Sequence, residues 1–312
     1  PGAGSGIRLE GVDDCIIRNN NIANNAIGIS LSVSYNNFLF ENKILNNWHG
    51  IWLDESSNNM VCGNNITANN GTGVWFRYSS DNSVSGNNIT GSGSEGIFFY
   101  DSSDNSVSGN NVTNNSCGVW LYGSSTNSVS ENNITSNREA GIVIGFSFDN
   151  TISSNNITNN RSGIHLGGSS NNFISKNKIA NNCYEGIWQH SSSNNVFYHN
   201  NFINNTEQVW SYISTSIWDS GYPSGGNYWS DYVGVDVKSG PSQNLPGSDG
   251  LGDTPYTIDA DNIDHYPLMN PYGAPPPPLS VSINPLSASI IVGQAVHFTS
   301  TVTGGTPPYI HK

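Results

Sequence analysis

Residues 86–135 read GNNITGSGSEGIFFYDSSDNSVSGNNVTNNSCGVWLYGSSTNSVSENNIT, and nearly the same phrase occurs twice within them. The repeat extends along the chain, because a glycine followed by an apolar residue recurs at steps of 22 or 23 residues. The nine glycines are Gly6, Gly28, Gly50, Gly73, Gly96, Gly118, Gly141, Gly163 and Gly186. An apolar residue closes an NNI-like phrase 16 residues after each glycine, so each added residue falls in one turn. A fixed spacing with one variable turn is typical of stacked repeats.

Within a repeat, apolar and polar positions alternate. In GVWLY, Val119 and Leu121 share one face and Trp120 and Tyr122 share the other, and a period of two predicts a strand. Three short strands per repeat cannot close a core alone, but stacked repeats form a continuous one. The sequence therefore predicts an all-β fold, a right-handed parallel β-helix of about nine to ten coils over residues 1–212. Leucine-rich repeats have a similar period, but their leucine framework and helical half are missing.

Three polar columns run through the repeat. The first is Asn20, Asn42, Asn64, Asn87, Asn110, Asn132, Asn155, Asn177 and Asn200. The second is Asn37, Asn59, Asn82, Asn105, Asn127, Asn150, Asn172 and Asn195, with Cys15 in the first repeat. The third is Ser34, Ser56, Ser79, Ser102, Ser124, Ser147, Ser169 and Ser192. Coils stacked ~4.8 Å apart let identical amides hydrogen-bond along the stack, and asparagine tolerates the left-handed conformation of sharp turns. We predict that these residues hold the corners.

The overall composition excludes some classes of partner. The chain has 10 Lys and Arg against 23 Asp and Glu, a net charge of −13, whereas a nucleic-acid partner would require a basic face. No apolar run approaches the ~20 residues of a membrane helix, so we expect no membrane insertion within this segment. Four cysteines match no zinc-binding spacing and occupy different repeat positions, which predicts free thiols: Cys15, Cys62, Cys117 and Cys183.

The phrase NSVSGNNIT followed by GI resembles the β-helix repeat of the NosD-like family, also called the CASH (carbohydrate-binding and sugar hydrolase) domain. The stretch from GGNYWSDY to DGLGDTPYTIDADNIDHYPLMNP, residues 225–271, resembles the C-terminal end of this family in archaeal surface proteins. SVSINPLSASIIVGQAVHFTSTVTGGTPPY, within residues 280–312, resembles the opening strands of an Ig-like or PKD-like module. The resemblance implies a secreted, extracellular protein of an archaeal cell surface. NosD proper is tied to copper delivery, but a His/Met/Cys cluster of that kind is missing, so we do not expect copper.

The outward side of the first strand of each repeat carries aromatic residues. We call Trp52, Trp75, Phe98 and Trp120 the aromatic strip, about 14 Å long over three coil steps. An exposed apolar patch usually marks a binding surface, and flat rings beside polar groups suit the faces and hydroxyls of sugars. The flanking residues are Asp54, Arg77, Tyr100 and Tyr122. We expect non-catalytic binding of a polysaccharide or cell-envelope glycan. The alternatives are rings that only stabilise the sheet under a covering segment, and a protein contact such as self-association.

The same face offers candidates for catalysis, which would make the chain a polysaccharide lyase or glycoside hydrolase. The candidates are Asp54, Glu55, Arg77 and Asp101. Glu55 and Asp101 lie two coils apart, nearly 10 Å, which slightly exceeds the carboxyl separation of inverting glycosidases. Asp54 and Arg77 lie on adjacent coils and predict an ordinary surface ion pair. A third hypothesis is a structural stalk, or a surface-layer or filament component, with no ligand.

The remaining segments have separate expectations. Residues 213–272 should cap the last coil, which would otherwise expose an edge. Asp249 and Asp253, in DGLGD, offer oxygen ligands for calcium. Residues 273–279, GAPPPPL, predict a stiff spacer before a partial Ig-like or PKD-like domain at 280–312. Five glycosylation sequons point outward on their strands, at Asn65, Asn88, Asn111, Asn133 and Asn156.

Overall fold

The structure is a computed structural model that describes residues 4–274, 280–287, 289, 292 and 295–303. These residues form strands, turns and irregular segments. None of the residues described forms a helix that could cross a membrane. The chain divides into two compact units, Pro1–Tyr272 and Gly273–Lys312.

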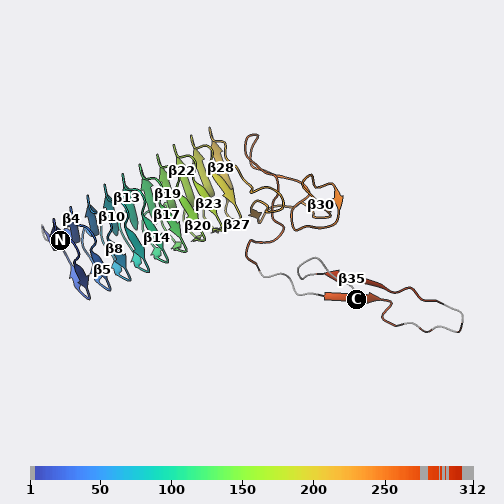
Figure 1. Ribbon diagram of the computed structural model, residues 1–312, viewed down its shortest axis with the longest axis horizontal. Coiled ribbons are helices and arrows are strands. Elements are labelled where there is room, and N and C mark those ends of the chain that lie inside the picture. The colour runs from blue at the N-terminus through green and yellow to red at the C-terminus, as the bar shows by residue number, and fades with distance from the viewer. Residues whose placement is uncertain (1–3, 275–279, 288, 290–291, 293–294, 304–312) are drawn as a thin grey trace. The chain divides into compact units, whose positions relative to one another are not determined.

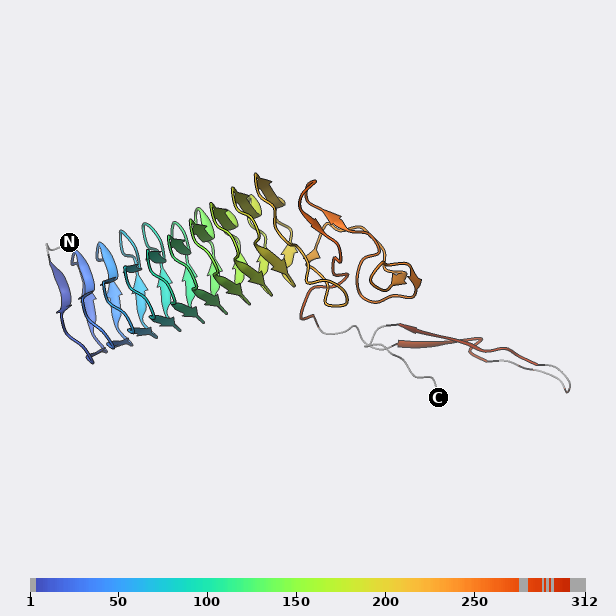
Figure 2. The same ribbon diagram turned by 45° about the horizontal axis from the view of Figure 1, so that its top comes forward.

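The first unit is a parallel β-helix. Each of the first nine coils gives one strand to each of three sheets, and within every sheet the strands follow one another in sequence order (Figure 1). The prediction of an all-β fold with about nine stacked coils is confirmed. In Figure 2, turned by 45°, the coils again succeed one another in colour order, from blue at the N-terminus to yellow.

Sheet A has longer strands than sheets B and C. Sheet A contains β1 (Ser5–Glu10), β4 (Ile27–Ser32), β7 (His49–Asp54), β10 (Val74–Arg77), β13 (Ile97–Tyr100), β16 (Val119–Tyr122), β19 (Ala140–Gly145), β22 (Ser162–Gly167), β25 (Glu185–His190) and β28 (Glu207–Tyr212). Sheet B contains β2 (Ile16–Arg18), β5 (Phe38–Phe40), β8 (Met60–Cys62), β11 (Ser83–Ser85), β14 (Ser106–Ser108), β17 (Ser128–Ser130), β20 (Thr151–Ser153), β23 (Phe173–Ser175) and β26 (Val196–Tyr198). Sheet C contains β3 (Asn21–Ala23), β6 (Lys43–Leu45), β9 (Asn65–Thr67), β12 (Asn88–Thr90), β15 (Asn111–Thr113), β18 (Asn133–Thr135), β21 (Asn156–Thr158), β24 (Lys178–Ala180), β27 (Asn201–Ile203) and β29 (Tyr228–Trp229).

The strand register places each repeat directly over its predecessor. Trp75 pairs with Trp52 on one side and with Phe98 on the other. The inward residues form a continuous apolar core, in which Phe76 and Phe99 are fully buried and stack with their ring centroids 4.6 Å apart. The repeated glycines are needed because a Cβ on Gly118, for example, would lie only 2.3 Å from a carbonyl oxygen of the next coil.

The asparagine ladders are confirmed. The Nδ2 of Asn64 donates to Asn87 Oδ1 at 3.0 Å and to the Leu39 carbonyl of the preceding coil at 2.9 Å. The Asn64 backbone N–H also donates to Asn87 Oδ1, at 2.8 Å. Each buried amide therefore joins three coils. The serine column forms a similar ladder, with the Ser56 N–H donating to Ser79 Oγ at 2.9 Å.

The structure corrects one part of that explanation. The left-handed residue is the one just before the corner asparagine, such as Asn58 (φ 58°) before Asn59 or Glu41 (φ 54°) before Asn42. The ladder asparagines therefore supply hydrogen bonds, and their neighbours supply the turn. A further ladder, absent from our sequence analysis, comprises Asn25, Asn47, Asn69, Ser92, Asn115, Asn137, Asn160, Asn182 and Asn205.

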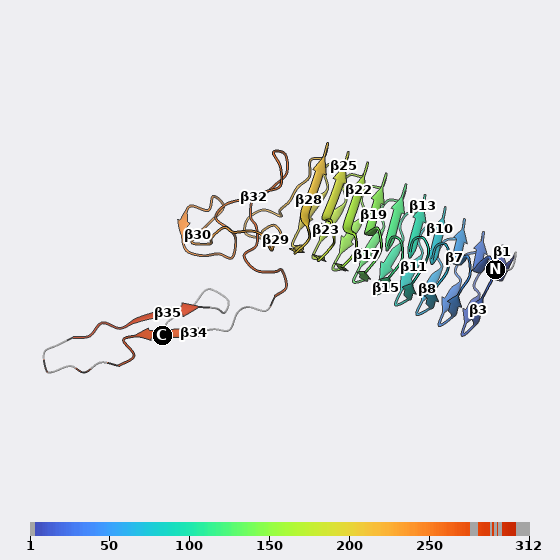
Figure 3. The same ribbon diagram turned by 180° about the vertical axis from the view of Figure 1, so that it is seen from behind.

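The segment after β28 packs onto the end of the β-helix, as Figures 1 and 3 show from opposite sides. β29 extends sheet C beside β27. Trp218 stacks on Phe197, and Trp229 stacks on Phe202, with centroid distances of 4.2 and 4.3 Å. Buried Asp264 accepts hydrogen bonds from the Asn227 N–H and from Trp229 Nε1, and burial raises the pKa of its carboxyl group to about 7. These contacts cover the last core rings.

Three short antiparallel pairs complete the described chain. They are β30 (Lys238–Ser239) with β31 (Leu245–Pro246), β32 (Tyr256–Thr257) with β33 (Ile263–Asp264), and β34 (Ser280–Asn284) with β35 (Thr299–Thr303). The last pair belongs to the second unit. Two predicted parts of the chain lie largely outside the described residues. They are most of the proline-rich spacer, at 275–279, and the end of the Ig-like or PKD-like domain, at 304–312.

Candidate functional site

The four residues of the aromatic strip lie on neighbouring strands of sheet A and are all partly exposed. The centroids of the Trp52 and Trp75 rings are 4.6 Å apart at 18°, and those of Trp75 and Phe98 are 5.7 Å apart at 29°. These three rings are stacked along the β-helix, whereas the rings of Phe98 and Trp120 are tilted by 50° with their centroids 5.6 Å apart. Because each inner ring covers its neighbour, the strip presents mostly ring edges to solvent.

The strip also contains polar atoms without partners. The indole nitrogens of Trp52, Trp75 and Trp120 are buried and make no hydrogen bond to any described residue. An unsatisfied buried donor costs roughly 1–3 kcal/mol. A row of rings selected only for stability would not require tryptophan at three of four positions.

Asp54 and Arg77 form the predicted surface ion pair. Arg77 Nε donates to Asp54 Oδ1 and Arg77 Nη2 donates to Asp54 Oδ2, both at 2.6 Å, and this pairing raises the pKa of Arg77. The guanidinium carbon also lies 5.8 Å from the centroid of the Trp52 ring. Both side chains are thus held in place beside the strip by each other.

The structure does not bring Glu55 and Asp101 together. Both lie in left-handed turns at the end of their strands, with φ of 48° and 46°, and the coil that carries Tyr78 lies between them. Of the four catalytic candidates, only Asp54 and Arg77 are in contact. The other two flanking residues, Tyr100 and Tyr122, stack with their ring centroids 5.6 Å apart, and the charge of Asp101 raises the pKa of Tyr100.

The aromatic columns are interrupted after β16. Trp120 pairs with Val143, and Tyr122 pairs with Gly145, which in turn pairs with Gly167. Aromatic residues resume beyond the gap, where Gly167 pairs with His190. The interruption forms an apolar hollow of about 370 Å³. Its lining includes Tyr122, Val143, Gly145, Phe146, Gly167 and His190. Our sequence analysis missed this site, although the break in both columns is visible in the repeat.

A polar hollow of about 340 Å³ lies at the other end of the same strands. It shares His165 and Trp188 with the apolar hollow, so the two adjoin. Its further lining residues are Glu139, Arg161, Ser162, Tyr184 and Glu185. Arg161 pairs with Glu139 at 3.6 Å and lies 5.0 Å from the centroid of the Tyr184 ring. Ser162 Oγ donates to Glu185 at 2.8 Å.

His165 lies between the two hollows. Burial lowers the pKa of its imidazole, so the ring is neutral near pH 7. Its Nε2 is buried and makes no hydrogen bond to the described residues. The rings of His165 and His190 both pack on Trp188, with centroid distances of 5.3 and 5.9 Å.

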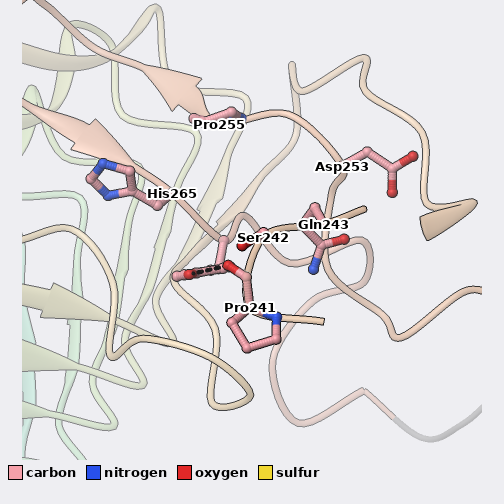
Figure 4. Close-up of a pocket in the computed structure, with 7 residues that line it drawn as sticks. Pro241, Ser242, Gln243, Asp253, Pro255 and His265 are labelled. Carbon is pink, nitrogen blue, oxygen red and sulfur yellow. Dashed lines mark hydrogen bonds between the residues drawn. The ribbon is translucent and has the colours of Figure 1, made fainter. Parts of the chain in front are cut away.

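Asp249 and Asp253, the calcium candidates, hold loops in the C-terminal segment. Asp253 accepts backbone N–H groups of Val237 and Lys238, and Asp249 accepts the Gly240 N–H at 3.2 Å. A small pocket of about 190 Å³ lies nearby, lined by Pro241, Ser242, Gln243, Asp253, Pro255, His265 and Tyr266, and Figure 4 shows the Asp253 carboxylate pointing away from the others. The described residues contain no group of three His, Cys, Asp or Glu side chains placed to hold a metal ion.

The five sequon asparagines form an outward ladder on sheet C. Asn88 Nδ2 donates to Asn65 Oδ1 at 2.9 Å, and the same contact recurs up to Asn156. Only Asn65 has an Nδ2 that donates to no other described residue. Glycosylation stays a prediction, and the ladder favours Asn65 as its acceptor. The four cysteines are free thiols, as predicted, and burial raises the pKa of Cys117 to about 11.

The stacked coils and the three parallel sheets define a right-handed β-helix repeat protein. Residues 2–112 match a family model described as a right-handed beta helix region. Residues 79–234, half of the chain, match the model described as periplasmic copper-binding protein (NosD). The chain belongs to the NosD family. No curated protein sequence matches it.

Several solved structures resemble the fold. The periplasmic alginate epimerase AlgG is 19% identical, with a TM-score of 0.54 over 61% of this chain and 55% of that one. The Dettilon tailspike protein is 15% identical, with a TM-score of 0.52 over 70% and 59%. A tailspike protein mutant of E. coli bacteriophage HK620, in complex with a pentasaccharide, is 13% identical, with a TM-score of 0.58 over 69% and 48%. The chain spans about half the length of these structures, and identities this low show the fold alone.

The family description names copper, but the described residues do not offer a suitable copper site. Copper prefers thiolate, thioether and imidazole ligands. The chain has two methionines, Met60 and Met269, and four cysteines on separate coils. Within the part of the chain that the structure describes, no group of three His, Cys, Asp or Glu side chains is placed to hold a metal ion.

Proposed function

We propose that the chain is an extracellular β-helix module that binds a polysaccharide or cell-envelope glycan through the outward face of sheet A, without catalysis. The observation that carries the proposal is the partly exposed aromatic strip with the Asp54–Arg77 pair held beside it, because flat rings next to polar groups suit the faces and hydroxyls of sugars. Within the unit Pro1–Tyr272, the segment after β28 packs at the end of the β-helix, beyond the strands that carry the aromatic strip.

The comparisons support a glycan as the kind of ligand. One similar structure is an epimerase of alginate by its title, and another was solved with a pentasaccharide. The word periplasmic in the NosD description and in the AlgG title supports a location outside the cytoplasm. A non-catalytic role is favoured over a lyase or hydrolase because Asp54 and Arg77 bind each other and Glu55 lies apart from Asp101.

A polysaccharide depletion assay tests the proposal. The whole chain is incubated with insoluble cellulose, mannan, chitin and isolated cell envelopes, and the protein left in solution is measured. We expect depletion by at least one polymer, and a several-fold weaker effect for the Trp52→Ala/Trp75→Ala variant. Ser30→Ala, on the same outward column, is the matched control. If the polymers deplete the variant and the parent equally, the strip has only a structural role, as expected for a stalk without a ligand. Release of soluble sugar would instead favour an enzyme.

A further inference from the structure

The apolar hollow is where ring faces become free. Inside the strip each ring covers its neighbour, but at the gap Tyr122 has only Gly145 beside it on the next coil, and His190 has only Gly167. Tyr122 and His190 are therefore separated by three coil steps, ~14 Å at the usual strand spacing. The Phe146 ring meets Tyr122 edge-on, with centroids 5.6 Å apart, and bounds one side. The gap is thus a slot between aromatic walls.

The two glycines at the bottom of the slot are not required by the backbone. Neither Gly145 nor Gly167 has a positive φ. A Cβ on Gly167 would meet nothing within 4 Å, and one on Gly145 would make an ordinary contact with Tyr122 at 3.4 Å. Glycine weakens a strand and often marks a place where a ligand approaches closely. Here glycine keeps open a volume of about 370 Å³, within the usual range of small-ligand sites, about 300–1,000 Å³.

The polar hollow continues the slot along the strands. It begins at the N-terminal ends of β22 and β25, and the apolar hollow lies at their C-terminal ends. Ser162, Tyr184 and the carboxylates of Glu139 and Glu185 offer donors and acceptors suited to hydroxyl groups. His165 stands at the junction. A ligand that fills both parts needs flat apolar faces at one end and many neutral hydroxyls at the other.

The charged residues on this face of sheet A favour a neutral polysaccharide over an anionic one. Every arginine in or just before a strand of sheet A already has a partner: Arg8 with Glu10, Arg77 with Asp54, Arg161 with Glu139, and Arg138 with the Gly93 carbonyl. Glu185 and Glu207 lie in register on adjacent strands beside the polar hollow. A uronate polymer would therefore meet like charges and no free cation among the described residues on this face. The net charge of −13 acts in the same direction.

We propose that the two hollows together bind a segment of a neutral hexopyranose chain, which crosses sheet A along β19 and β22. One sugar ring lies over Gly145 and Gly167 between Tyr122 and His190, and the next units reach Arg161 and Glu185. The proposal rests on the proposed function for the class of ligand and adds the position and the neutral charge. The bound chain runs across the β-helix, at a right angle to the aromatic strip.

The test is a titration of the whole chain with neutral β-1,4-linked hexasaccharides of glucose, mannose and galactose, followed by tryptophan fluorescence. Hexamannuronate and hexagalacturonate are the anionic counterparts. We expect a neutral hexamer to bind, and the Gly145→Val/Gly167→Val variant to raise its Kd at least tenfold. The same variant should melt at an equal or higher temperature, because valine favours strands. Ser32→Val, in the same outward column on β4, is the control.

Three results would overturn the inference: no hexamer binds, a hexauronate binds as tightly as the best neutral hexamer at low salt, or the double valine variant binds like the parent. The Trp52→Ala/Trp75→Ala variant, measured in parallel, separates this inference from the proposed function. If the strip variant loses polymer depletion while the valine variant keeps hexamer binding, the strip is the site and the hollow is not. The opposite pattern retains the hollow and removes the strip.

Discussion

Ser92 is the one interruption of the third buried asparagine ladder. Its Oγ is buried without a partner, whereas Asn47 and Asn115 each donate an amide hydrogen bond to the asparagine of the next coil. The Ser92 N–H still donates to Asn115 Oδ1 at 2.9 Å, so the backbone is in ladder position. Ser92→Asn should therefore stabilise the fold by about 1 kcal/mol, the usual net value of one hydrogen bond. Chemical denaturation measures the change, and Ser94→Asn, on the same turn, is the control. A loss of stability would show that the corner has no room for an amide.

Gly118 illustrates a glycine that packing requires. An added Cβ would lie 2.3 Å from the Gly141 carbonyl oxygen and 2.5 Å from the Ile134 side chain. We expect Gly118→Ala to destabilise the chain by ~3 kcal/mol, because overpacking forces a shift of two coils. Gly167→Ala is the matched control and should be neutral or slightly stabilising, since its Cβ has open space. Thermal unfolding compares the two, and equal effects would contradict the packing explanation.

The residue scale also shows what the repeat could and could not predict. Columns of identical residues at fixed spacing identified two asparagine ladders, because a ladder leaves a trace in every coil. The third ladder leaves the same trace, because an asparagine stands three residues after the closing apolar residue in every repeat except that of Ser92, so the repeat could have predicted it too. The left-handed position was misassigned because Asn58 and Asn59 are adjacent and identical in type.

At the scale of the strand, alternation predicted which side chains of sheet A point outward, but not how the rings are oriented. Face-to-face stacking follows from the coil spacing and from the contact between neighbouring rings, which depend on side-chain rotamers. The hollow could have been inferred from the strands themselves. Val143 interrupts the first outward column for one coil, and Gly145 and Gly167 interrupt the second for two consecutive coils.

Strand β22 also carries a pH prediction. Burial lowers the pKa of His165 below its ordinary value of 6.5. As the pH falls, the unfolded chain therefore takes up a proton on this histidine before the folded chain does, and the proton favours unfolding. The free energy of unfolding is unaffected by this histidine above pH 6.5, and it decreases as the pH falls from 6.5 to the lower pKa of the folded state. We expect the melting temperature of the parent to fall, relative to a His165→Phe variant, between pH 7.5 and pH 5. Phenylalanine fits this outward column, as at Phe98. A difference that does not change with pH would show that the imidazole is not shielded in the folded chain.

At the scale of the whole molecule, the stability of the β-helix depends on its ends, because the last coil of a stack has no further coil to cover its core. Residues 213–272 bring Trp218 and Trp229 onto Phe197 and Phe202, so their removal would expose the last core rings and two unpaired strand edges. We expect a chain ending at Tyr212 to aggregate or to melt at a clearly lower temperature. A chain ending at Tyr272 keeps the first compact unit complete and is the control. Size-exclusion chromatography and thermal unfolding distinguish the two. If the shorter chain stayed monomeric with an unchanged melting temperature, the stacked tryptophans would contribute nothing to the stability of the coils beneath them, and the β-helix would have to close its core at coil nine by other contacts.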